Sequence, residues 1–252
     1  MELPPGLQIV SDLHLETPYL HARYLCLLGD IGRIKDDGLS GFLESLLQQT
    51  PNLNIFYVFG NHEAYQLSIA NATARMRDRI FLLDRTRLDI TPKVTVLGCT
   101  LWSNILPQEV QTVNLFLTDF HEERGIQGWT SNDHVDAHRR DLEWLNTEVE
   151  KIQRDEPYRQ IAILTHHSPT KDPRANREQH LKGNVNSAFV TDLSSEPCWK
   201  SPQVKLWAFG HTHYNFPPFI DEVTGKLLFV NHKGYSKAEG IGWNPDRFRK
   251  HQ

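Results

Sequence analysis

Short apolar runs alternate along the chain with stretches in which apolar residues recur at helical spacing. Continuous apolar runs are typical of strands that are covered on both faces. The five runs that matter most lie at 7–10, 24–28, 55–59, 161–164 and 204–209. Helical spacing is seen at 39–48, and again at 133–152 after an Asn132-Asp133 cap signal. The pattern predicts a layered α/β fold.

The last part of the chain has a different pattern. Residues 217–220 and 226–230 flank a turn-rich 221–225 segment and predict a β-hairpin. Residues 172–183 are polar and predict a surface loop near the site rather than a boundary. We see no repeat or convincing linker, so residues 1–252 are expected to form a single domain.

A polar cluster follows each of the five predicted strands. In α/β folds, ligands bind just beyond the carboxyl ends of the strands, so these clusters are expected to converge on one site. The clusters are Ser11-Asp12, Gly29-Asp30, Gly60-Asn61-His62, Thr165-His166-His167 and Gly210-His211-Thr212-His213.

Composition narrows the class of protein. The chain has 252 residues, a formal net charge of −4 and 39% hydrophobic residues, which excludes a disordered polymer. No run approaches the roughly 18 apolar residues of a membrane span, and no secretory signal is seen, so a cytoplasmic location is the expectation. Near-neutral charge predicts no dedicated nucleic-acid-binding surface. Three distant cysteines, Cys26, Cys99 and Cys198, predict buried thiols rather than disulfides.

The donor set in the clusters suits divalent metal ions. Two carboxylates, one amide oxygen and four imidazoles are offered without any thiolate. Such mixed oxygen and nitrogen ligands fit Mn, Fe or Zn, and one shared carboxylate would allow two ions to bind side by side. Residues two apart in an extended segment point the same way, which pairs Asp12 with His14 and His211 with His213.

In order, the motifs are D-x-H at 12–14, G-D at 29–30, G-N-H-E at 60–63, His166 and G-H-x-H at 210–213. This series resembles the calcineurin-like metallophosphoesterase superfamily over residues 9 to about 235. The resemblance implies a four-layer αββα sandwich of two mixed β-sheets with a dinuclear centre. It implies one ion held by Asp12, His14, Asp30 and His213, and a second held by Asp30, Asn61, His166 and His211.

The resemblance also implies a mechanism. A hydroxide bridging two divalent ions would attack the phosphorus of a phosphomonoester or phosphodiester, with Asp30 as the bridging ligand. His62 would protonate the leaving oxygen, and Glu63 or Asp30 is a candidate acceptor that orients it. The expected substrate is a small-molecule or nucleotide phosphoester.

Two departures from the superfamily pattern stand out. His232-Lys233 replaces the Pro-Arg of a closing N-P-R-G-Y segment, and Gly32-Arg33 follows G-D where many members have a further acidic residue. Neither departure falls on a predicted metal ligand. Lys233 and Arg33 are expected to be solvated, with phosphate binding as the alternative.

Several other side chains have a plain structural interpretation. His134 and His138 have the spacing of a zinc pair but are expected to be a solvated helix start. His167 is expected to point away from the site, with a phosphate contact as the alternative. Four other histidines are predicted at the surface: His21, His121, His180 and His251. Trp129 and Phe189 are predicted either to form the floor of a substrate pocket or to pack locally in a loop.

A second class of function remains open. The same superfamily includes non-catalytic scaffolds that use the fold for protein interaction. The filled ligand positions and His62 favour an enzyme over a metal-binding scaffold or interaction module. The sequence does not indicate the oligomeric state, the native metal, or whether the substrate is a monoester or a diester.

Overall fold

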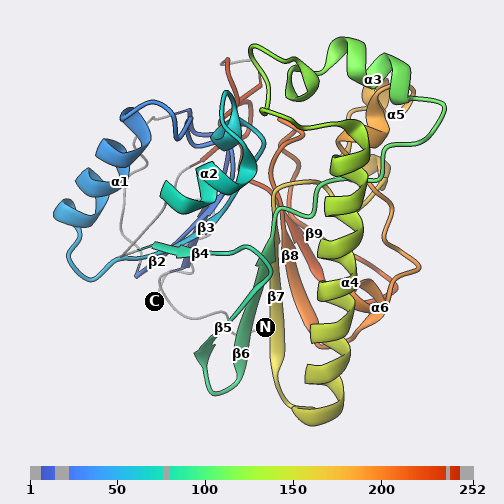
Figure 1. Ribbon diagram of the computed structural model, residues 1–252. Helices are drawn as coiled ribbons and strands as arrows, with labels where there is room; N and C mark the ends of the chain where they lie inside the picture. The colour runs from blue at the N-terminus through green and yellow to red at the C-terminus, as the bar shows by residue number, and fades with distance from the viewer. Residues whose placement is uncertain (1–6, 15–22, 76–79, 237–238, 245–252) are drawn as a thin grey trace.

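The computed structural model describes residues 7–14, 23–75, 80–236 and 239–244 of the chain. Two β-sheets lie face to face, with helices on the outer side of each, so the molecule has four layers (Figure 1). This is the αββα architecture that the resemblance implied, but only the second sheet is mixed, since the described strand pairs of the first are all parallel. His21 and His251 lie outside the described residues.

The first sheet is built from the N-terminal part of the chain. Its strand order is β1-β2-β3-β4, and all three described strand pairs are parallel. Helices α1 and α2 cover its outer face (Figure 1). The bounds are β1 Leu7–Val10, β2 Tyr24–Leu28, α1 Gly38–Gln49, β3 Asn54–Val58, α2 Ile69–Arg75 and β4 Ile80–Leu82.

The second sheet is mixed. Its order is β5-β6-β7-β8-β10-β9, with antiparallel pairs at both edges and parallel pairs between them. The antiparallel β9–β10 pair confirms the predicted hairpin. The bounds are β5 Thr86–Thr91, β6 Val94–Cys99, β7 Gln160–Thr165, β8 Val204–Ala208, β9 Phe219–Ile220 and β10 Leu227–Phe229.

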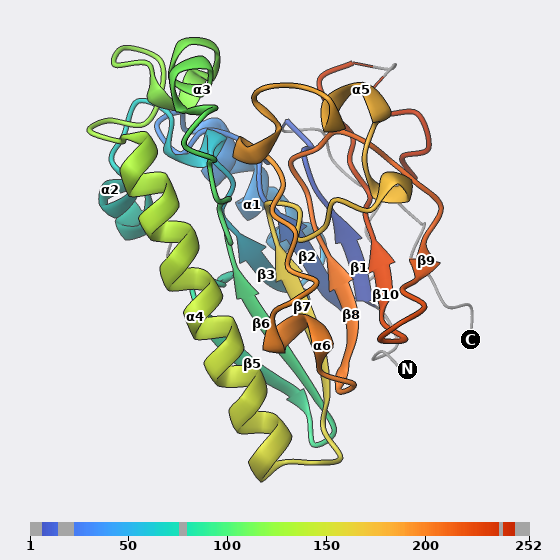
Figure 2. The same cartoon turned by 90° about the vertical axis from the view of Figure 1, so that its right-hand side faces the viewer.

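Helices α4 (Ser131–Asp155) and α6 (Pro197–Lys200) cover the outer face of this sheet (Figure 2). The helix α4 begins two residues before the predicted start, because Thr130 caps it. The Thr130 hydroxyl accepts from the Asp133 amide while the Asp133 carboxylate accepts from the Thr130 amide. Such a reciprocal capping box satisfies two otherwise free amides of the first turn.

The continuous apolar runs are explained by burial on both faces. In β2, Leu25 and Leu27 pack toward the helices, while Cys26 and Leu28 pack between the sheets. Strand β7 alternates in the same way about the second sheet. All three cysteines are buried free thiols, as expected.

The remaining helices gather at one end of the molecule, at the top of Figures 1 and 2. They are α3 Val110–Phe116, α5 Glu178–Leu181 and the short 3-10 turns η1 His62–Ala64, η2 Thr118–Phe120, η3 Pro173–Ala175 and η4 Asn186–Ala188. The segment predicted as a surface loop, 172–183, contains η3 and α5.

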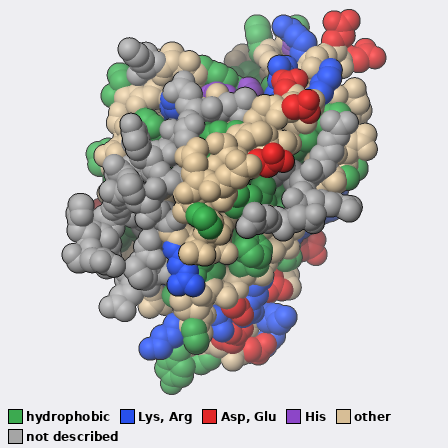
Figure 3. All heavy atoms as spheres, turned by 90° about the vertical axis from the view of Figure 1, so that its left-hand side faces the viewer, with side chains coloured by type: hydrophobic (Ala, Val, Ile, Leu, Met, Phe, Trp, Pro, Cys, Tyr) green, Lys and Arg blue, Asp and Glu red, His purple; other side chains and the backbone are tan. Residues whose placement is uncertain are grey.

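The surface has no strong bias of charge on the face seen in Figure 3, where basic and acidic side chains are interspersed. In the part of the chain that the structure describes, no helix combines the length and hydrophobicity needed to cross a bilayer.

Candidate metal centre

The predicted ligands lie in tight turns directly after the strands. Asp12, Asp30 and His211 adopt left-handed backbone conformations with φ of 53°, 56° and 69°. His14 and His213 do the same, with φ of 47° and 46°. Such conformations cost about 1–3 kcal/mol each for non-glycine residues and cluster at functional sites. The chain turns sharply here, so side chains at several strand ends face one another.

Two glycines make this close approach possible. Gly29 has a φ of 82°, and a Cβ there would lie 2.4 Å from Nδ1 of His166. A Cβ at Gly60 would lie 2.2 Å from Oδ1 of Asp30. Neither distance is tolerable, so only glycine allows these loops to pack against the ligand side chains.

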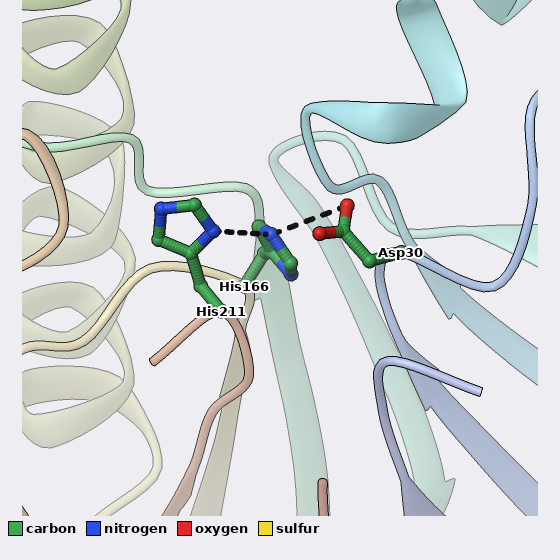
Figure 4. Close-up of side chains that lie close together, drawn as sticks. All are labelled: Asp30, His166 and His211. Atoms are coloured by element: carbon green, nitrogen blue, oxygen red, sulfur yellow. Dashed lines mark hydrogen bonds and ion pairs between the residues drawn. The ribbon is translucent and has the colours of Figure 1, made fainter. Parts of the chain in front are cut away.

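The first ligand group contains Asp30, His166 and His211 (Figure 4). His166 Nδ1 lies 2.8 Å from the Leu28 carbonyl, which can only accept, so this nitrogen carries the proton. In the neutral ring, Nε2 then presents a lone pair. It faces His211 Nδ1 at 3.1 Å, Asn61 Oδ1 at 3.2 Å and Asp30 Oδ1 at 3.5 Å. Acceptor atoms that converge in this way fit a bound cation.

The orientation of Asn61 is fixed from behind. Its amide nitrogen donates to Asp119 Oδ1 at 2.8 Å and to the Tyr65 hydroxyl at 2.9 Å. The Tyr65 hydroxyl also donates to Asp119, at 2.7 Å. The Asn61 oxygen is therefore left facing the ligand group. The sequence did not predict this role of Asp119, because the residue lies in the η2 turn after α3 and belongs to no motif.

The second group contains Asp12, Asp30 and His213. Asp12 Oδ1 lies 2.9 Å from His213 Nε2. The other ring nitrogen of His213 contacts Glu239 Oε2 at 2.8 Å. A carboxylate on the far nitrogen of a ligating imidazole fixes its tautomer and orientation. Asp30 belongs to both groups, as expected of a bridging carboxylate.

His232 also belongs to the surroundings of this group. It is fully buried, and its Nδ1 contacts Asp12 Oδ2 at 2.8 Å. His232 is one of the two residues that depart from the superfamily's closing segment. It is not itself a predicted ligand, but its imidazole contacts the predicted ligand Asp12. Glu239 and His232 were missed as contacts because they are distant in sequence from Asp12 and His213.

His14 is beside the second group but not within it. Among the described residues it joins neither set of converging ligand atoms. Its Nε2 is buried without a hydrogen-bond partner, and its ring lies 5.9 Å from that of His213. The ring of Tyr235 stacks on it, with the centroids 4.1 Å apart.

His62 lies at the mouth of the site. Its amide donates to Asp30 Oδ1 at 3.1 Å, and its Nε2 is 3.8 Å from Asp30 Oδ2. The hydroxyl of Tyr235 lies 2.6 Å from the same nitrogen. Tyr235 therefore contacts the predicted acid, a contact that the sequence did not indicate.

Glu63 does not orient His62, so that part of the sequence-based expectation is wrong. Its buried carboxylate accepts hydrogen bonds from the amides of Asp30, Ile31, Gly32 and Gly60 and from the Tyr57 hydroxyl. These bonds tie the loop after β2 to the loop after β3. Glu63 is a structural residue that supports the loops of the candidate metal centre.

The expectation that His134 and His138 form a solvated helix start is also wrong. Their exposures are 0% and 5%. His138 Nδ1 bonds the Leu101 carbonyl at 2.8 Å, and His134 Nε2 accepts from the Ser103 amide at 3.2 Å. The two rings therefore bind the backbone of the β6–α3 connection at two neighbouring points, Leu101 and Ser103. The helical periodicity of α4 did not indicate this burial, because the β6–α3 connection, which is distant in sequence, covers the first turns of the helix.

The remaining predictions concern residues around the site. His167 is fully buried behind His211, with their ring centroids 4.1 Å apart, rather than in a position to meet phosphate. Trp129 packs on Trp102, whereas Phe189 lines the cavity beside the site. Arg33 pairs with Asp36 and His180 is exposed.

Burial and close charges perturb the titration of the site. Burial raises the pKa of Asp30 and lowers that of His62. Burial also opposes the charged form of His213, but Asp12 and Glu239 outweigh it and raise the pKa to about 9. The carboxylates thus hold positive charge on a neighbouring imidazole. A divalent cation would supply that charge directly, so the donor set and its electrostatics both fit metal binding.

The family model described as calcineurin-like phosphoesterase matches residues 9–215. The chain belongs to this family. The match covers all the motifs from which the site is built, so family membership and the observed convergence agree.

One curated protein and one solved structure are similar to the chain over nearly its whole length. Protein L509 of Acanthamoeba polyphaga mimivirus is 29% identical over 283 residues, covering 95% of this chain and 94% of the relative. The crystal structure of phosphopantetheinyl hydrolase (PptH) from Mycobacterium tuberculosis is similar in fold, with a TM-score of 0.67 and 17% identity. The aligned region covers 96% of this chain and 93% of the chain in that structure.

Proposed function

We propose that the chain is a metal-dependent phosphoester hydrolase with two divalent ions per molecule, Mn, Fe or Zn. The observation that carries the proposal is the position of Asp30, which belongs to both groups of converging ligand atoms. In the proposed assignment one ion is held by Asp12, Asp30 and His213, with His14, whose buried Nε2 has no hydrogen-bond partner, as the fourth ligand. The other is held by Asp30, Asn61, His166 and His211.

A pair of divalent ions supplies an activated water at neutral pH and neutralises charge on the phosphoryl oxygens. The chain contributes the rest of the chemistry. His62 protonates the leaving oxygen, since it lies at the open side of the site with its amide anchored to Asp30 at 3.1 Å. Tyr235, 2.6 Å from Nε2, holds the imidazole in place. The negative charge of a bound phosphoester favours the protonated imidazole that this role needs.

The first experiment tests hydrolysis itself. Protein stripped with a chelator and reloaded with Mn²⁺, Zn²⁺ or Fe²⁺ is assayed with p-nitrophenyl phosphate and bis-p-nitrophenyl phosphate. We expect turnover with metal and none with chelator, and we expect Asp30→Asn to lose both metal and activity. Metal binding without turnover of either ester would favour the alternative, a metal-binding scaffold.

The second experiment tests the role of His62. If His62 donates the proton, His62→Ala retains metal and loses about 10²–10⁴-fold in rate with poor leaving groups. The loss shrinks for nitrophenolate, which leaves without protonation. Equal losses for good and poor leaving groups would refute the acid role.

A further inference from the structure

A cavity with a volume of about 600 Å³ opens directly onto the candidate metal centre. Asp30, Asn61, His62 and His211 form one end of it. Ligand pockets for small molecules measure about 300–1,000 Å³, so this cavity exceeds what a phosphoryl group alone requires. Most of the side chains that face the remaining space lie outside the sequence motifs.

One side of the cavity is apolar. We call it the apolar wall, and it consists of Phe116, Leu117, Val185, Phe189 and Val190. Helix α3 and the η4 segment supply it, and they pack on one another through a small hydrophobic cluster. The ring of Phe189 stacks on His211 with the centroids 4.8 Å apart, so the wall begins at the ligand group itself.

Away from the candidate metal centre, positive charge is scarce in the cavity. The Asp, Glu, Lys and Arg side chains that line it are Asp30, Asp119, Glu239 and Arg177, and the positive charge on His213 lies at the candidate metal centre itself. Arg177 is already engaged, since its Nη2 donates to the His213 carbonyl at 3.0 Å. A phosphomonoester brings close to two negative charges and a diester only one. Beyond the candidate metal centre the lining adds little positive charge, so that part of the cavity suits the less charged ester better.

Phe116 is the most telling residue of the wall. It is 70% exposed at the end of α3, in a position where a large apolar side chain gains little from packing within the protein. Its neighbour Leu115 is 68% exposed but does not line the cavity. A side chain such as Phe116 can bury its surface against an apolar part of a ligand that enters the cavity.

We propose that the substrate is a phosphodiester with an extended uncharged organic arm, and that this arm lies along the apolar wall. The proposal rests on the proposed function, because the phosphoryl group is assigned to the metal centre. It adds the substrate class and the subsite that selects it.

The test is a series of p-nitrophenyl phosphodiesters in which the second ester arm is methyl, butyl or hexyl. Each buried methylene contributes up to roughly fourfold in kcat/KM, so we expect a rise of at least about tenfold from methyl to hexyl. Phe116→Ala should flatten this rise. Leu115→Ala is the matched control, because it removes an equally exposed apolar side chain next in sequence, and it should keep the rise.

The outcomes separate the subsite from the activity. The subsite is overturned if the methyl ester is hydrolysed, kcat/KM does not rise with the length of the arm, and Phe116→Ala behaves as Leu115→Ala for every ester. That result leaves the proposed phosphoesterase activity intact. A higher kcat/KM for p-nitrophenyl phosphate than for every diester overturns the substrate class. A loss in Phe116→Ala alone that is equal for all arms supports the wall, with the nitrophenyl arm as its occupant. No turnover of any ester overturns the proposed function itself.

Discussion

The substitution Glu63→Gln tests the structural account of the metal-site loops. Glu63 is fully buried, and its two carboxylate oxygens accept five hydrogen bonds. Oε2 accepts from the amides of Asp30 and Gly60 at 2.9 and 2.7 Å. Oε1 serves Ile31, Gly32 and the Tyr57 hydroxyl. Every partner donates its hydrogen to the carboxylate. In the glutamine variant the NH₂ group replaces one of the two oxygens, so at least two of these donors then face another donor and lose their acceptor.

The magnitude follows from the donors left without an acceptor. A buried donor that loses its partner costs about 1–3 kcal/mol, so two of them lower the free energy of unfolding by about 2–6 kcal/mol. This is a large part of the roughly 5–15 kcal/mol of a typical domain. In a chain of this size the melting temperature falls by about 2–4 °C for each kcal/mol.

The assay is urea or thermal unfolding in excess chelator, so that metal binding does not add to the stability of the folded state. Tyr57→Phe removes one donor and leaves the amides bonded, so it should cost less than Glu63→Gln. Glu44→Gln, an exposed position on α1, should change stability by less than about 0.5 kcal/mol. If Glu63→Gln is as mild as Glu44→Gln, the carboxylate does not hold the loops.

Two further predictions concern charge. Burial raises the pKa of Asp141 to about 6 despite Arg85, whereas the unfolded chain titrates it near about 3.9. The native state therefore gains a proton first as the pH falls. The stability of the wild type relative to Asp141→Asn should rise by about 2 kcal/mol as the pH falls from 7 to 4.5, and a flat difference in urea unfolding contradicts this. Glu239→Ala should weaken metal binding about 10–100-fold in calorimetric titrations, because Glu239 orients His213. Glu222→Ala is the control, because the Glu222 side chain is 87% exposed. Equal metal affinities for the two variants would refute the role of Glu239.

The sequence predicted the parts of the structure that depend on local pattern. Apolar runs located strands β1, β2, β3, β7 and β8 within about a residue, because both faces of each are buried. Polar clusters at strand ends identified the side chains that converge, because parallel strands end at one edge. The membership of Asp30 in both groups of converging ligand atoms could be anticipated in this way.

What the sequence did not predict depends on tertiary contacts. Asp119, His232 and Glu239 support the predicted ligands from distant parts of the chain. Asp119 and Glu239 lie in no motif, and the closing segment that contains His232 did not indicate its contact with Asp12. His134 and His138 were expected in solvent because the covering of α4 by the β6–α3 connection has no signature in helical periodicity. Glu63 belongs to a motif, but only the structure shows that its carboxylate faces backbone amides rather than His62.

The central claim is that two ions bound around Asp30 together support hydrolysis. It is tested most directly by titrating chelator-stripped protein with Mn²⁺ while following the hydrolysis of bis-p-nitrophenyl phosphate, at a protein concentration well above the Kd of the metal. The account predicts that the rate rises to a plateau at about two equivalents per chain and that Asp30→Asn shows no rise. A plateau at about one equivalent, or metal uptake with no hydrolysis at any ratio, would contradict it.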